Sequence, residues 1–242
     1  MPYNTRYRSL GISGFLPPGV KWLLIVNVAL FLPSYLFPSL EEHMRLLSLV
    51  PVMVVRHFAI WQLATYMFLH AGVLHILFNM LALWMFGSAL ESDWGTRQFL
   101  KYYFLCGIGA GLCDVTLNGL MGHWDTRTVG ASGAIYGLLL AFGLLYPNTP
   151  VVFFIFPMKA KYMVMIFGAV AFLGALHPGS GVSDIAHLGG MAFGYTYLRG
   201  RFFRLDMGYL RREYDAWKLR RAKKRFQVYL RKHGSDRDTF VN

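Results

Sequence analysis

The residues best suited to chemistry in this sequence are a serine and a histidine, each lying beside glycines. Ser132 belongs to Gly130-Ala131-Ser132-Gly133, where an apolar run to Tyr146 begins. Glycine lets the backbone turn sharply, and the first turn of a helix presents unpaired N–H groups that can hold an oxyanion. A serine at this position can act as a nucleophile if a base lies beside it. By itself the stretch equally suits a helix-packing face, because small residues four apart let membrane helices approach closely.

His187 is the candidate base. Gly190 and Gly194 follow it by three and seven residues, so the imidazole shares a face of its helix with two glycines. A second glycine face, on the Ser132 helix, would let the two backbones pack closely enough for Ser132 Oγ to reach His187. Tyr136 lies one helical turn after Ser132 and would contact the imidazole as an aromatic wall or as a hydrogen-bond partner.

Two further polar residues, His75 and Asn79, lie four apart on one face of another predicted helix. Each could be an interhelical hydrogen-bond partner and nothing more. His70, slightly earlier in the chain, is at most a supporting neighbour of this pair. Ionisable groups within a membrane are costly and commonly mark function, so the joint occurrence of these residues with Ser132 and His187 favours a catalytic site.

The composition indicates that membrane helices position these residues. Of the 242 residues, 55% are hydrophobic and 15% are charged, whereas soluble domains carry roughly a quarter of their residues as charged. Several apolar stretches approach or reach the ~17 to 25 residues that cross a bilayer. We therefore predict an all-α integral membrane protein with six spans, over residues 20–37, 73–90, 99–120, 131–146, 161–176 and 185–198.

The basic residues predict an orientation. Fourteen of the 24 Lys and Arg residues lie at or after Arg199, and both termini on the inner side would leave only Arg45, Arg56 and Arg127 outside. The chain then divides into an inner segment 1–19, a helical domain 20–200 and a basic amphipathic tail 201–242. The net charge of +12 points to anionic lipid headgroups and not to nucleic acid, because it gathers in that tail. The opening residues do not form a removable signal peptide.

In this orientation the second, fourth and sixth spans run inward, which brings Ser132, His187, His75 and Asn79 within about two turns of the outer surface. No carboxylate is predicted at this depth, so we expect a serine–histidine dyad without an acid partner. Asp114, the nearest intramembrane acid, has the wrong spacing for a triad. Cys106 and Cys113 lie two turns apart on one helix, too far for a disulfide, and we interpret both as apolar packing residues. No metal or cofactor is predicted.

Three connecting segments have distinctive compositions. The outer stretch 38–72 contains a short amphipathic helix near residues 41–47 and an aromatic segment after Trp61, and it should lie partly in the bilayer interface. The apolar heptad 151–157 reads as packing on the inner side and not as another crossing. The glycine-rich loop 177–184 and the fifth span are the candidates for a moving gate.

The chain resembles the rhomboid intramembrane serine proteases. The similarity covers about residues 61–198 and rests on Gly130-x-Ser132-Gly133 with Tyr136, on His75-x-x-x-Asn79, and on Ala186-His187-x-x-Gly190-x-x-x-Gly194. The run Gly87-x-x-x-Glu91-x-x-x-Gly95 also fits. One departure is Gln62, where many members have arginine after the loop tryptophan, which concerns loop stability.

The resemblance implies that His187 acts as general base to Ser132, with His75, Asn79 and the Ser132 N–H as the oxyanion hole. The implied substrates are transmembrane segments with small residues at the cut and a helix that unwinds easily. We also predict a multi-pass protein in a bacterial inner (plasma) membrane, with a site open to the outer side. The alternatives are a non-catalytic relative that binds transmembrane helices and a proton-coupled transporter. The transporter lacks support because neither an acidic relay nor an internal repeat is found. The sequence does not predict the oligomeric state.

Overall fold

The computed structural model describes residues 16–40, 44–153, 156–176 and 184–200, together with Lys218, Arg221 and Lys223. Their contacts group the chain into two units, 1–196 and 197–242, and everything below concerns the first. The main helices are α1 (Pro18–Leu36), α5 (Val73–Ala82), η3 (Leu83–Gly87), α6 (Ser88–Trp94), α7 (Thr96–Leu120), α8 (Ser132–Leu145) and α9 (Ala160–Ala175). A last helix covers residues 184–200.

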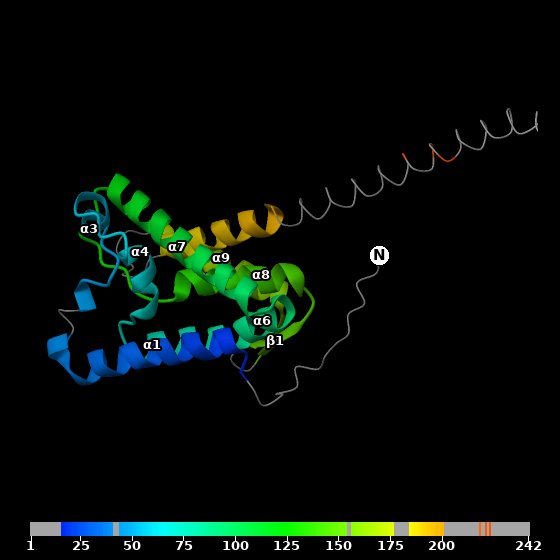
Figure 1. Cartoon of the computed structure of the whole chain (residues 1–242), viewed down its shortest axis with the longest axis horizontal. Helices are drawn as coiled ribbons and strands as arrows, with labels where there is room; N and C mark the ends of the chain where they lie inside the picture. The colour runs from blue at the N-terminus through cyan, green and yellow to red at the C-terminus, as the bar shows by residue number, and fades with distance from the viewer. Residues whose placement is uncertain are drawn as a thin grey trace, which may run out of the picture. The chain divides into compact units, whose positions relative to one another are not determined.

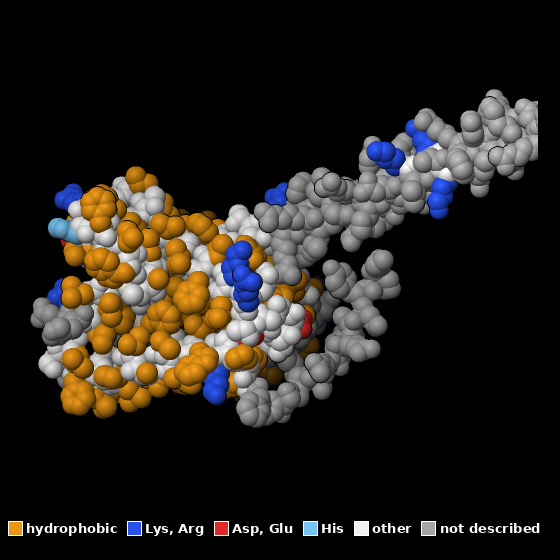
Figure 2. All heavy atoms as spheres, viewed as in Figure 1, with side chains coloured by type: hydrophobic (Ala, Val, Ile, Leu, Met, Phe, Trp, Pro, Cys, Tyr) orange, Lys and Arg blue, Asp and Glu red, His pale blue; other side chains and the backbone are white. Residues whose placement is uncertain are grey.

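Three helical segments are long and apolar enough to cross a bilayer, namely Pro18–Leu36, Val73–Trp94 and Thr96–Leu120, whereas α8 and α9 are shorter apolar helices. Large hydrophobic side chains cover the helical body in Figure 2, and the most exposed of them on α1, α5 and α9 include Trp22, Leu74 and Met165. A water-soluble protein would bury these side chains, so the chain is an integral membrane protein. The helices match the predicted spans closely, while the six crossings and their direction stay a prediction.

The helix α7 is the centre of the packing. It contacts α1, α3, α4, α6 and α8, and it runs diagonally through the helical body in Figure 1. Four of its buried residues are the glycines Gly107, Gly109, Gly111 and Gly119. Because glycine has no side chain, neighbours approach the α7 backbone directly, and Tyr66 donates a hydrogen bond to the carbonyl of Gly107 at 2.7 Å.

A buried carboxylate ties α1 to α6. The Glu91 side chain is 2% exposed and accepts hydrogen bonds from the N–H groups of Gly19 and Val20, both at 2.8 Å, and from the Thr96 hydroxyl at 2.6 Å. Gly19 and Val20 belong to the first turn of α1, which has no side-chain cap of its own. Glu91 therefore satisfies donors that a helix N-terminus leaves unpaired and places a negative charge at the positive end of its dipole.

The segment between α1 and α5 is made of short helices: η1 (Pro38–Leu40), α3 (Pro51–Arg56), α4 (Gln62–Thr65) and η2 (Tyr66–Phe68). The Gln62 amide fastens them, because its oxygen accepts from the Val50 N–H at 3.1 Å and its nitrogen donates to the Leu46 carbonyl at 3.2 Å. Gln62, which stands where the arginine of the resembled family pattern would be, is thus a buried residue whose hydrogen bonds connect the parts of this segment. Of the amphipathic helix expected near residues 41–47, the first three residues lie outside the described part, and Met44 and Arg45 are helical.

The all-α prediction is wrong in one place. Residues expected to form irregular packing make a two-stranded antiparallel hairpin, β1 (Pro150–Phe153) and β2 (Phe156–Lys159), with Val151 opposite Met158. Val151 is buried and Val152 is exposed, the alternation that a strand imposes. Each strand of the hairpin has four residues, which is too short to cross a membrane. Segment 1–15, the loop 177–183 and nearly all of the basic tail lie outside the described residues.

Candidate active site

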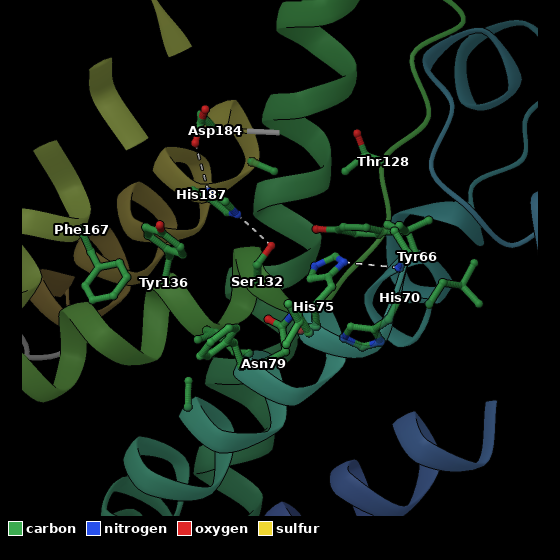
Figure 3. Close-up of a pocket in the computed structure, with 18 of the residues that line it drawn as sticks. Tyr66, His70, His75, Asn79, Thr128, Ser132, Tyr136, Phe167, Asp184 and His187 are labelled. Carbon is green, nitrogen blue, oxygen red and sulfur yellow. Dashed lines mark hydrogen bonds and ion pairs between the residues drawn. The ribbon is translucent and has the colours of Figure 1, made fainter. Parts of the chain in front are cut away.

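The structure brings Ser132 and His187 into hydrogen-bond contact, with Ser132 Oγ 2.8 Å from His187 Nε2 (Figure 3). Ser132 is the first residue of α8, and His187 lies on the helix described over 184–200. The His187 residue is 6% exposed. A hydroxyl and an imidazole at this distance can exchange a proton, which is the requirement for activating a serine nucleophile.

Glycines make this approach possible. An added Cβ at Gly190 would overlap the carbonyl of Gly133 and lie 2.8 Å from its carbon, and one at Gly137 would lie 3.2 Å from the carbonyl oxygen of Gly190. The helices carrying the two functional residues therefore touch backbone to backbone. Gly194 has a different neighbour, because a Cβ there would lie 3.2 Å from Cζ of Tyr102 on α7.

Gly130 shapes the turn before α8. Its φ of +122° lies in a region that residues with a side chain rarely adopt, and a Cβ there would be 2.7 Å from His75 Nε2. The preceding chain is held by the Asp114 carboxylate, which accepts hydrogen bonds from Asn118 and Thr128, both at 3.0 Å. Asp114 thus has a structural contact with the loop that leads to the serine.

His75 and Asn79 lie on α5 and line the same cavity as Ser132. Asn79 Nδ2 donates to the backbone carbonyl of His75 at 2.8 Å, and His75 Nδ1 accepts from the Ala71 N–H at 3.3 Å. Because Nδ1 accepts this hydrogen bond, the hydrogen of a neutral His75 imidazole lies on Nε2, the ring nitrogen that faces Gly130. The amide of Asn79 keeps one N–H that the His75 carbonyl does not use.

The Tyr136 ring stacks on the His187 imidazole, with centroids 4.1 Å apart and planes within 4°. On its other side the ring meets the edge of Phe167 from α9, at 6.0 Å. Of the two sequence-based possibilities for Tyr136, the geometry is that of the aromatic wall. His70 meets His75 edge to face at 5.1 Å, and burial, followed by the nearby His75, lowers the pKa of His70 to about 3.

The expectation that no acid lies near the histidine is wrong. Asp184 Oδ1 lies 3.4 Å from His187 Nδ1, within ion-pair distance. Among the described residues Nδ1 has no hydrogen-bond partner, and its contact with Asp184 is electrostatic. We predicted that Asp184 ends a glycine-rich loop, but it is helical, in the helix described over 184–200. The signal that was available is its position three residues before His187, which places both on one helical face.

A cavity of about 1790 Å³ extends along this site. Its polar lining includes Ser132, His187, His75 and Asn79, and its apolar lining includes Phe78 and Met163 from α5 and α9. The volume exceeds that of a typical small-molecule pocket. Among the described residues no group of three or more His, Cys, Asp or Glu could hold a metal ion.

The Rhomboid domain model matches residues 57–202. RHOMBOID-like protein 1 of Arabidopsis thaliana is 33% identical over 145 residues, which is 59% of this chain and 35% of the relative. Rhomboid protein 1, mitochondrial, of Saccharomyces cerevisiae (strain ATCC 204508 / S288c) is 34% identical over 54% of this chain and 38% of the relative.

A bacterial relative has a similar degree of identity. Rhomboid protease GluP of Bacillus subtilis (strain 168) is 33% identical over 56% of this chain and 25% of its own length. The chain therefore spans between a quarter and two fifths of the length of these three relatives. Since the family model covers more than half of the sequence, this chain belongs to the rhomboid family.

Proposed function

We propose that this chain is a serine endopeptidase that cleaves transmembrane segments of other membrane proteins, with Ser132 as nucleophile and His187 as general base. The observation that carries the proposal is the 2.8 Å contact between Ser132 Oγ and His187 Nε2 at the wall of a large cavity. The similarity to a Bacillus subtilis protein that is named a rhomboid protease supports it.

In the proposed reaction His187 Nε2 takes the Ser132 proton as the oxygen attacks the peptide carbonyl. The protonated imidazole then gives that proton to the departing amine, and water hydrolyses the acyl-enzyme by the same route. Stacking of Tyr136 on His187 fixes the plane of the imidazole, so Nε2 stays directed at Ser132.

The oxyanion would be held by three donors. They are the Ser132 N–H at the start of α8, His75 Nε2–H and the free N–H of the Asn79 amide. The Ser132 N–H has no intrahelical partner because it opens the helix, and the helix dipole adds positive potential at the same point. Removing one such donor typically lowers the rate by about 10²–10³.

The length of α8 supports a site below the membrane surface. Its 14 residues span ~21 Å at ~1.5 Å per residue, less than the ~30 Å of a bilayer core. If the C-terminal end of α8 lies at the inner boundary, Ser132 lies ~9 Å below the outer one, where water can still reach it. We place the six crossings with both ends inside, as the Lys and Arg distribution favours.

The proposal extends to the division of the chain and to its location. Residues 20–200 would form the protease domain, 1–19 an inner segment and 201–242 a basic tail against anionic headgroups. The membrane would be a bacterial inner membrane, with the site opening to the outer side. Substrates would be transmembrane helices that unwind easily, because an intact helix hides its carbonyls in hydrogen bonds.

A fluorophosphonate probe tests the nucleophile. We expect purified protein in detergent to be labelled, Ser132→Ala and His187→Ala to lose the label while staying folded, and Ser88→Ala to keep it. Ser88 is a matched control because its buried hydroxyl has no hydrogen-bond partner among the described residues. In liposomes, wild type and not Ser132→Ala should cleave single-span substrates. Folded protein that is never labelled, but retains bound transmembrane helices, would instead make it a non-catalytic binder.

A further inference from the structure

The carboxylate of Asp184 lies between the candidate base and α9. Its Oδ1 is 3.4 Å from His187 Nδ1, and the Asp184 side chain is 13% exposed. Figure 3 shows the two side chains directed toward each other, with Ser132 on the opposite side of the imidazole. The imidazole is therefore flanked by the nucleophile at Nε2 and by an acid at Nδ1.

The other side of this carboxylate meets Gly174 near the end of α9. An added Cβ at Gly174 would overlap Asp184 Oδ2 and lie 2.6 Å from its Cγ. A second contact from α9 runs through Phe167 to Tyr136, whose ring stacks on His187. Thus α9 contacts Asp184 through Gly174 and Tyr136 through Phe167, although it does not itself supply a polar group to Ser132.

Proton transfer from Ser132 makes the imidazole positive. A carboxylate at Nδ1 stabilises that charge, and the low effective dielectric of a buried site strengthens the interaction. The acid also favours the tautomer with hydrogen on Nδ1, which leaves Nε2 free to accept the serine proton. Asp184 takes up no proton in this scheme. The proton moves only from Ser132 Oγ to His187 Nε2 and then to the leaving amine.

We propose that Asp184 is a positioning residue for His187 and that the packing of α9 on it at Gly174 sets this contact, so that the placement of α9 controls the strength of the base. The inference rests on the proposed function. The titratable groups that face His187 are Asp184 on its own helix, Tyr136 on α8 and His75 on α5, beside the Ser132 hydroxyl. From α9 come Phe167 and Gly174, which do not titrate.

Substitution of the acid tests its role. Asp184→Asn keeps the shape of the side chain, and we expect kcat/KM to fall by about ten- to a hundredfold, the range typical of residues that orient a functional histidine through its other nitrogen. The acid limb of the pH profile should move to lower pH, because the carboxylate that favours the protonated imidazole is gone. A purely structural role would leave the position of that limb unchanged.

A double-mutant cycle tests the link to α9. Gly174→Ala should lower kcat/KM to a similar extent, because the added methyl displaces the carboxylate. In the Asp184→Ala background the same substitution should have little effect, because the carboxylate that it displaces is absent. The control is Gly168→Ala on the same helix, where a Cβ would lie 3.5 Å from the flexible Met191 side chain. It should leave kcat/KM unchanged in both backgrounds.

The outcomes separate the two proposals. If the fluorophosphonate does not label folded wild-type protein at Ser132, the proposed function itself is refuted. Normal labelling with an unchanged rate and pH profile in Asp184→Asn would refute only the role of the acid. If Gly174→Ala and Asp184→Ala lower the rate additively, the coupling through α9 is wrong even though the acid matters. Thermal unfolding of each variant shows whether a lost rate reflects a lost fold.

Discussion

Substitution of Gly190 by alanine offers a severe test of the helix contact that joins Ser132 to His187. The added Cβ would lie 2.8 Å from the carbonyl carbon of Gly133 and would overlap its oxygen, whereas ordinary contacts begin at 3.4 Å. The helices must therefore separate by at least about 0.6 Å, and further to clear the oxygen. Because the Ser132–His187 contact is 2.8 Å, a displacement of this size takes it beyond normal hydrogen-bond length.

The expected consequences follow from that displacement. A misplacement of about 1 Å at a reacting centre can cost ~10² in rate, and overpacking of a core costs about 1–3 kcal/mol. We expect Gly190→Ala to cleave a single-span substrate about a hundredfold more slowly and to unfold at lower temperature or denaturant concentration.

The control and the decisive outcome come from the same assays. Gly168→Ala adds a methyl where there is room, and alanine favours a helix by up to ~1 kcal/mol over glycine, so this variant should be neutral or slightly more stable. Both variants would be compared by cleavage in liposomes and by unfolding in detergent. A Gly190→Ala protein with the wild-type rate and stability would show that the close backbone contact does not position the dyad.

Three further predictions concern other residues. Glu91→Ala should lower the free energy of unfolding by about 3 kcal/mol, because buried N–H groups of α1 lose their acceptor; unfolding in detergent measures this, and Glu91→Gln should lose less. Asn79→Ala should keep folding and fluorophosphonate labelling while slowing cleavage by about 10²-fold, if its amide holds the oxyanion; an unchanged rate would exclude it. Because the pKa of His70 is lowered from 6.5 to about 3, the contribution of its neutral form to the free energy of unfolding should be complete above pH 6.5 and should decline as the pH falls toward 3. In a pH series of unfolding measurements, the free energy of unfolding of His70→Phe should therefore decline less than that of wild type.

The sequence was most informative where apolar runs define helices. The predicted start of the fourth span at residue 131 and of the fifth at 161 each lie one residue from the observed α8 and α9. The hairpin was missed because 151–157 is apolar throughout, and a short continuous run does not distinguish a strand from a buried loop. The prediction ended the second span at Leu90, whereas the π-helical turn η3 is followed without a break by α6, which ends at Trp94.

The partners of polar residues were harder to predict than their locations. Glu91 was recognised within a family-like motif, but its contacts with Gly19 and Val20 join positions more than seventy residues apart. No local pattern encodes such a pairing. Asp184 was missed for a different reason, since the glycine-rich stretch before it predicted a loop. The spacing of three residues places Asp184 and His187 on one helical face only if residue 184 is itself helical.

The helices that carry the site are packed to different extents, which predicts where the molecule opens. Twelve of the 25 residues of α7 are buried, but only Ala160, Met163 and Ala171 of the 16 in α9 are. Local opening free energies follow buried apolar contact, so α9 should separate from α8 long before α7 does. Hydrogen exchange in detergent should show the α9 amides exchanging ahead of those in α7, and Gly174→Ala should speed exchange in α9 further because it strains the contact with Asp184. Equal protection of both helices would mean that α9 is held as firmly as the core, and a transmembrane substrate would then need another path to Ser132.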